Sequence, residues 1–165
     1  MGEHDGKWSR RQLLWTMGGA FLAYGCGADG PAEQVDAQPG FLAATPPERS
    51  IESPRFAMGV ASGDVTETSA LLWAQHDLAR ELELVVYAMV GGEYVSEVVA
   101  TRVGARAGGF FHVHVHNLTP AARYRFVFYE LERARRTARS PIGRFRAALP
   151  ADALEVVTFG ACSCT

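Results

Sequence analysis

From Phe56 onward the chain alternates between short apolar runs and short groups of turn residues. Every second residue from Leu82 to Val90 is apolar, and the pair Gly91-Gly92 that follows is typical of a tight hairpin turn. Period-two alternation with frequent turns predicts an all-β sandwich of about seven strands rather than helices. The expected strands are Ser69–Gln75, Leu82–Val90, Tyr94–Thr101, Phe110–His116, Tyr124–Leu131 and Ile142–Ala148.

A more specific signal is the stretch Leu-Thr-Pro-Ala-Ala-Arg-Tyr, which ends at Tyr124. Fibronectin type III and immunoglobulin-like sandwiches place a tyrosine near the start of a late strand, and its hydroxyl bonds back to the chain a few residues upstream. The stretch is similar to the fibronectin form of this tyrosine corner. We therefore predict a fibronectin type III or immunoglobulin-like β-sandwich over residues 55–150, with a structural role for Tyr124.

Residues 1–25 have the order of an export signal, with basic residues followed by an apolar run. The stretch Ser9–Leu14 contains Arg10 and Arg11 and resembles the twin-arginine signal, which a receptor reads before the folded protein is exported. This predicts a location in the periplasm or cell envelope.

The end of the apolar run, Leu-Ala-Tyr-Gly before Cys26, resembles a lipoprotein box. Acylation of Cys26 would tether the domain to a membrane. The alternative is a plain signal peptide followed by an incidental cysteine. Residues 26–54 are rich in glycine and proline and poor in large apolar side chains, so we expect a flexible, disordered linker.

Composition narrows the functional classes. The 165 residues include 16 Lys and Arg against 18 Asp and Glu, a net charge of −2, which argues against a nucleic-acid-binding role. The hydrophobic share of 48% and the charged share of 21% are those of an ordinary globular domain. Three cysteines are too few for a disulfide framework.

Charge is nevertheless unevenly distributed. The segment Arg123–Arg146 contains eight arginines and two glutamates, whereas Asp64–Glu97 contains seven acidic residues and a single arginine. Such polarity could steer an anionic ligand or dock against an acidic partner. A solvated surface is the simpler interpretation and the one that the pattern favours.

Three histidines, His112, His114 and His116, alternate along one expected strand. They would share one face at a spacing of about 6.7 Å, and two such side chains can hold a zinc ion. The alternation also turns Val113 and Val115 inward, and no carboxylate or cysteine lies close in sequence. A metal site, a pH-sensitive patch and a solvated strand face all remain open, and the last agrees best with the pattern.

The stretch Phe56–Asp64 reads Phe-Ala-Met-Gly-Val-Ala-Ser-Gly-Asp. By itself it indicates a turn of small residues after a strand. It is too short for a phosphate cradle, so local chemistry gives it no catalytic role.

Together these stretches resemble the N-terminal region of PhoD-like alkaline phosphatases, a family of exported metallophosphoesterases, over about residues 56–165. The Gly-Val-Ala-Ser-Gly-Asp stretch is the most specific part of the resemblance. It implies an enzyme that hydrolyses phosphate esters with divalent or trivalent metal ions, iron and calcium in this family. The segments that carry it are Ser9–Leu14, Phe56–Asp64, Ser69–Trp73, Leu118–Tyr124, Ser140–Phe145 and Phe159–Cys162.

The resemblance also implies a role for residues 151–165. They would begin the catalytic domain with its first strand, and Cys162 would be a metal ligand, since a thiolate suits iron or zinc. An ordinary thiol is the alternative. The family's Gly-Asp-x-x-Tyr and Asn-His motifs do not occur in these residues.

One thiolate cannot hold a catalytic metal assembly. We therefore expect this chain alone to bind no metal and to be inactive, as the front part of a longer enzyme. Its partners would then be a phosphate-ester substrate and its own catalytic domain. The competing hypothesis is a complete, lipid-anchored, fibronectin-like interaction module.

Overall fold

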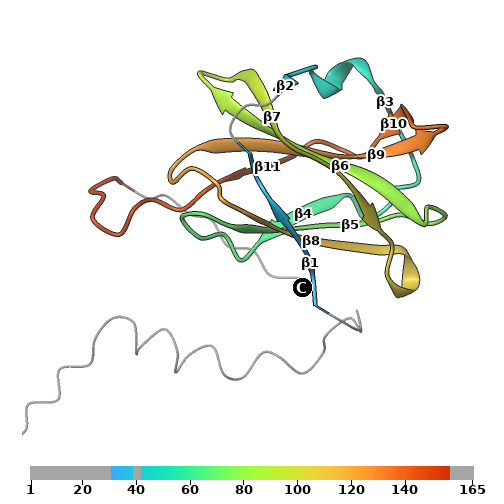
Figure 1. The fold of residues 1–165 in the computed structure, drawn as a ribbon, viewed down its shortest axis with the longest axis horizontal. Helices are drawn as coiled ribbons and strands as arrows, with labels where there is room; N and C mark the ends of the chain where they lie inside the picture. The colour runs from blue at the N-terminus through green and yellow to red at the C-terminus, as the bar shows by residue number, and fades with distance from the viewer. Residues whose placement is uncertain (1–30, 39–41, 157–165) are drawn as a thin grey trace, which may run out of the picture.

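The computed structural model describes residues 31–38 and 42–156, which form two β-sheets packed face to face (Figure 1). Two 3-10 turns, η1 (Pro47–Arg49) and η2 (Ala107–Gly109), are the only helical segments among these residues. The four-stranded sheet consists of β1 (Glu33–Asp36), β4 (Val60–Gly63), β5 (Ala70–Gln75) and β8 (Phe110–His116). The seven-stranded sheet consists of β2 (Leu42–Ala43), β3 (Ile51–Glu52), β6 (Glu81–Val90), β7 (Glu93–Gly104), β9 (Arg123–Glu132), β10 (Arg135–Arg139) and β11 (Gly143–Arg146).

The strand order confirms the predicted all-β sandwich. The smaller sheet has the order β1-β8-β5-β4, and the larger has the order β2-β7-β6-β9-β10-β3, with β11 paired to β9. Strands β6 and β9 run through the centre of the larger sheet, and their neighbours extend from them on both sides.

The core lies between the sheets and is built from alternate residues of the central strands. Burying one leucine, valine or phenylalanine side chain stabilises the fold by about 1.5–3 kcal/mol. Shifting the pairing of a strand by one residue would turn all of its apolar side chains toward water, so the alternation fixes the strand register. The fully buried members include Leu72, Leu84, Val86, Phe111, Val113, Val115, Phe126 and Phe128.

The predicted hairpin between β6 and β7 is confirmed. Val90 pairs with Glu93, and Gly91 and Gly92 form the turn between them with φ angles of +60° and +94°. Two successive positive φ angles match the right-handed twist of the flanking strands, and glycine adopts them without steric cost.

The tyrosine corner is also confirmed. The Tyr124 hydroxyl accepts a hydrogen bond of 2.8 Å from the backbone N–H of Thr119. Its buried ring stacks on Phe145, with ring centroids 5.1 Å apart. The bond fixes the loop before β9, so Tyr124 has the structural role expected for it.

The expectation of a disordered linker over residues 26–54 is wrong for the part that the structure describes. β1 pairs in parallel with β8, β2 pairs with β7, and β3 pairs in parallel with β10. These strands join the sheets through backbone hydrogen bonds, while most side chains of β1 and β3 stay exposed. They therefore leave no apolar alternation in the sequence.

Residues 42–54, which we call the strap, cover the outer face of the larger sheet. This face carries a second apolar cluster of Val85, Tyr87, Val127 and Tyr129, and Ala44 of the strap packs against it. Glu48 of the strap accepts hydrogen bonds from Tyr94 and Arg125, and the Pro47 carbonyl accepts one of 2.9 Å from Arg139. The larger sheet is thus covered on both faces.

Two further strands were not expected. Val60–Gly63, interpreted as part of a turn, is the edge strand β4, and the arginine-rich Arg135–Arg139 is β10. Both pair through the backbone, β4 with β5 and β10 with β9. Small residues in one and arginines in the other hide the usual strand pattern.

Arg136 joins three strands through a network of ion pairs. Its guanidinium donates to Glu83 at 2.9 and 3.1 Å and to Glu97 at 3.1 and 3.3 Å, and it lies 4.8 Å from the centroid of the Tyr129 ring. Burial alone would lower the pKa of Arg136, but the hydrogen bonds to the two glutamates outweigh it and raise that pKa. The side chain therefore stays charged.

We expect Tyr124→Phe to lower the free energy of unfolding by about 1 kcal/mol, because the Thr119 N–H loses its acceptor. Urea unfolding measures the change. Thr119→Ala is the control, since it keeps the backbone N–H and should unfold like the wild type. Equal stability of the Tyr124 variant and the wild type would contradict a stabilising corner.

We expect Arg136→Met to lower the free energy of unfolding by about 3 kcal/mol, because Glu97, only 4% exposed, would lose its counter-charge. Arg135→Met, which removes an exposed arginine from the same strand, should change it by less than about 0.5 kcal/mol. Urea unfolding of both variants tests the difference. Similar losses of unfolding free energy in the two variants would mean that the ion pairs of Arg136 add nothing beyond the effect of removing one positive charge.

Candidate functional site

The three histidines of β8 lie on the outer face of the four-stranded sheet, as the alternation predicts. His112, His114 and His116 are half-buried, and the rings of His114 and His116 have centroids 4.4 Å apart. Gln34 of β1 bonds the Nε2 atom of His116. The ring of His112 lies 6.4 Å from that of Trp73 and 6.4 Å from that of Phe110.

These neighbours are aromatic rings and an amide rather than further metal ligands. Within residues 31–38 and 42–156, no group of three or more His, Cys, Asp or Glu is placed to hold a metal ion. Partial burial, together with the charge of Arg106, lowers the pKa of His112, which favours its neutral imidazole. A pH-sensitive role for this face stays a prediction.

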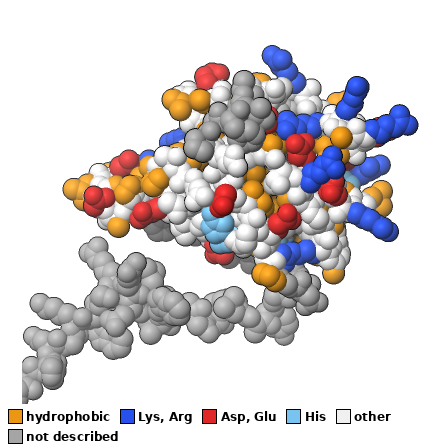
Figure 2. Space-filling view, viewed as in Figure 1, with side chains coloured by type: hydrophobic (Ala, Val, Ile, Leu, Met, Phe, Trp, Pro, Cys, Tyr) orange, Lys and Arg blue, Asp and Glu red, His pale blue; other side chains and the backbone are white. Residues whose placement is uncertain are grey.

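The arginines between Arg123 and Arg146 do not form one surface. Arg136 and Arg139 are held in ion pairs with glutamates of the sandwich. Arg133 lies in the turn between β9 and β10, and Arg135 is the first residue of β10. Basic side chains gather at the right-hand end of Figure 2, where Figure 1 places this hairpin.

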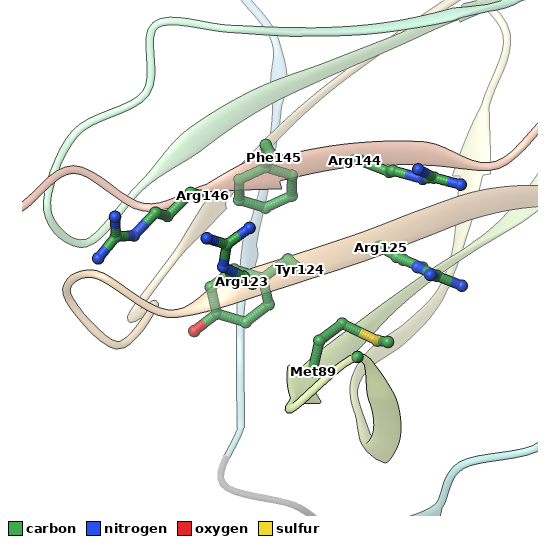
Figure 3. A pocket seen from close by; sticks show the side chains of 8 residues that line it. Met89, Arg123, Tyr124, Arg125, Arg144, Phe145 and Arg146 are labelled. Atoms are coloured by element: carbon green, nitrogen blue, oxygen red, sulfur yellow. The ribbon is translucent and has the colours of Figure 1, made fainter. Parts of the chain in front are cut away.

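The remaining four, Arg123, Arg125, Arg144 and Arg146, lie together, and we call them the arginine quartet. Arg144 is opposite Arg125, and Arg146 is opposite Arg123, in the antiparallel pairing of β9 with β11. They line a pocket of about 310 Å³ that Met89 also borders (Figure 3). The pairing thus turns a scattered charge pattern into a local concentration of guanidinium groups.

The stretch Phe56–Asp64, the most specific sequence signal, contributes to the fold. Its Ser62 pairs with Leu72 of β5, and the buried Phe56 packs edge-on against His76, with ring centroids 4.8 Å apart. Asp64, directly after the strand, has a φ of +46°. The described contacts of this stretch belong to an edge strand and its turn.

His76 belongs to a buried polar network that the sequence did not indicate. Its side chain is 1% exposed, and its Nδ1 atom accepts hydrogen bonds from the N–H groups of Leu78 and Ala79 at 3.1 and 2.8 Å. Nδ1 therefore carries no proton, and Nε2 donates to Glu130 at 3.1 Å. Glu130 is 54 residues from His76 and 77 residues from Ser53 in the sequence, so these residues form no local sequence motif.

Ser53 also donates to Glu130, and Arg55 lies 3.6 Å from the same carboxylate. Serine, histidine and glutamate are the residues of a nucleophilic triad, but a triad requires the serine to bond the imidazole. Here the serine bonds the carboxylate, and the imidazole nitrogen facing that carboxylate already carries a proton. The arrangement supports the β9 strand and cannot activate the serine.

The other predicted site residues lie outside the described residues. They are the export-signal pair Arg10 and Arg11, the lipidation candidate Cys26 and the metal-ligand candidate Cys162. Within the described part of the chain, no helix is both long and apolar enough to span a membrane.

The Glu130 network predicts a pH-dependent contribution to stability. Burial raises the pKa of Glu130, but hydrogen bonds from Ser53 and His76 outweigh it and leave that pKa below the ordinary value of 4.5. The contribution is therefore fully present above about pH 4.5 and is lost as the pH falls through the lower folded-state pKa. Urea unfolding between neutral and acidic pH should show a shallower loss for Glu130→Gln than for the wild type.

Glu132→Gln, at an exposed position two residues along β9, is the matched control and should keep the wild-type slope. Parallel losses of stability in the wild type and the Glu130 variant would show that the network does not contribute in this way.

Comparisons with known structures give distant matches. A structure of PhoD matches 63% of this chain and 21% of its own length, with 22% identity and a TM-score of 0.48. The FN5 domain of Drosophila Lar matches 69% of this chain and 96% of its own length, with 16% identity and a TM-score of 0.44. A fibronectin type III domain from the human KIAA0970 protein matches 64% of this chain and 84% of its own length, with 11% identity and a TM-score of 0.41.

No curated protein sequence matches the chain. The chain spans about a fifth of the length of the PhoD structure. The family described as "PhoD-like phosphatase, N-terminal domain" matches residues 42–149, which begin at the strap and end just beyond β11. This chain therefore belongs to the PhoD-like phosphatase N-terminal domain family.

Proposed function

We propose that the chain is the N-terminal part of an exported PhoD-like phosphatase, and that its sandwich supports a metal-dependent phosphoesterase domain. The observation that carries this proposal is the family match over residues 42–149. That range contains every strand of the sandwich except β1, and it includes the strap.

The reaction would be hydrolysis of a phosphate ester. In such enzymes, metal ions polarise the phosphate oxygens and activate the attacking oxygen. Iron and calcium are the ions that the family resemblance implies, and Cys162 is the ligand proposed in this chain. The described residues do not fit such ions, because no three ligands meet among them, and we assign them no step of the reaction.

The role proposed for the sandwich is to pack against its own catalytic domain. Arg10 and Arg11 would direct export of the folded protein by the twin-arginine route. Cys26 would anchor it to the membrane if it is acylated. The export signal and the anchor rest on the sequence patterns alone.

The test compares three proteins in hydrolysis of p-nitrophenyl phosphate and bis(p-nitrophenyl) phosphate with added iron and calcium. They are the 165-residue chain, a version extended through the reading frame that follows it, and the extended version with Cys162→Ala. We expect the first to be inactive, the second active and the third strongly impaired, because the third lacks one metal ligand.

An extended version that loads metal and stays inactive would contradict the proposal, and so would activity of the 165-residue chain. If the codons that follow encode no phosphoesterase motifs, the interaction-module hypothesis would replace it. In that case the sandwich surface itself would carry the function.

A further inference from the structure

The arginine quartet places four positive side chains on a small part of the larger sheet. Directly opposed residues in antiparallel strands have Cβ atoms about 5 Å apart, and residues two apart along a strand are about 7 Å apart. Since Arg144 faces Arg125 and Arg146 faces Arg123, the four side chains start from the corners of a small rectangle. Like charges at this spacing repel one another.

Glutamates neutralise only part of this charge. Glu48 pairs with Arg125 at 2.9 Å, and Glu155 pairs with Arg146 at 3.0 Å. The side chains of Arg123 and Arg144 are exposed and make no ion pair or hydrogen bond with any residue that the structure describes. The rectangle therefore keeps an excess of two positive charges.

The two paired arginines are also held in position. The guanidinium of Arg125 lies 4.9 Å from the centroid of the Tyr94 ring and donates to its hydroxyl at 2.7 Å. Arg146 donates from Nε to the Ala121 carbonyl at 2.9 Å. The site thus combines two oriented guanidiniums with two that can move onto a ligand.

The space beside these side chains is hollowed. In Figure 3, Arg125 and Arg144 extend in the same direction from the neighbouring strands β9 and β11. Met89 and Gly92 also line the pocket of about 310 Å³, and a small ligand in it can contact several guanidiniums at once.

We propose that the arginine quartet binds a ligand with two or more linked phosphate groups, such as pyrophosphate or tripolyphosphate. A guanidinium matches two oxygens of a phosphate through parallel hydrogen bonds. Linked phosphates carry several negative charges in a small volume. They can therefore neutralise the two positive charges that the glutamates leave uncompensated in the quartet. The inference goes beyond the proposed function, because the quartet lies wholly on the described sandwich and needs no catalytic domain.

The test is calorimetric titration of the full 165-residue chain with tripolyphosphate, orthophosphate and citrate at low salt. We expect tripolyphosphate to bind most tightly and its affinity to fall as salt is added. The double variant Arg123→Ala/Arg144→Ala should weaken binding at least about tenfold, because it removes the two uncompensated charges. Both of these side chains lack partners in the described structure, so the fold should be kept, and urea unfolding checks this.

The matched control is Arg133→Ala/Arg135→Ala, which removes two exposed arginines from the hairpin between β9 and β10. It should weaken tripolyphosphate binding by less than about threefold, as expected for a change in long-range charge alone. An equal loss in the control would overturn the proposal, and so would an absence of wild-type binding.

Two further results would overturn the ligand class. Citrate binding as tightly as tripolyphosphate would assign the site to clustered carboxylates. Retention on phosphatidylglycerol vesicles without binding of soluble tripolyphosphate would assign it to a lipid surface.

Discussion

The pairing of β6 with β9 is the contact on which the rest of the sandwich depends, because both faces of this pair are removed from water. Val86 pairs with Phe126 on the inner face, and Val85 pairs with Val127 on the outer face, with all four side chains fully buried. An antiparallel sheet commonly leaves one face to solvent. Here a second layer has to cover each side.

The two covers are of different kinds. The four-stranded sheet covers the inner face with a continuous apolar core. The strap lies over the outer face, where Ala44 packs against the second cluster and polar contacts are made through Glu48 and the Pro47 carbonyl. Tyr87 and Tyr129 share a hydrogen bond of 3.0 Å beneath it, and burial together with this bond raises the pKa of Tyr87. The outer layer thus includes hydrogen bonds and ion pairs that the inner core lacks among its clustered apolar side chains.

The sequence predicts the parts of the fold whose signals are local. Alternation in Phe110–His116 predicts β8 with its observed bounds, and the stretch ending at Tyr124 predicts the tyrosine corner. It could not predict β1 or β3, because their exposed side chains carry no period and only their backbone groups bind the sheets.

The same distinction holds for the candidate sites. The sequence indicates an excess of arginine after Arg123, but only the register of β9 with β11 separates the quartet from arginines that are paired elsewhere. The buried pair of His76 and Glu130 joins a loop to a distant strand, so no spacing in the sequence could reveal it.

The short edge strands β1 and β3 show that residues before 55 are part of the folded domain. β1 occupies the open side of β8, and β3 occupies the open side of β10, in both cases by parallel pairing. A chain begun at residue 55, where the hydrophobic pattern starts, would lose Ala37 from the core and the strap from the outer face, and it would expose the backbone edges of both strands. Unpaired edges recruit other chains, so the segment that resembles a linker protects the sandwich against self-association.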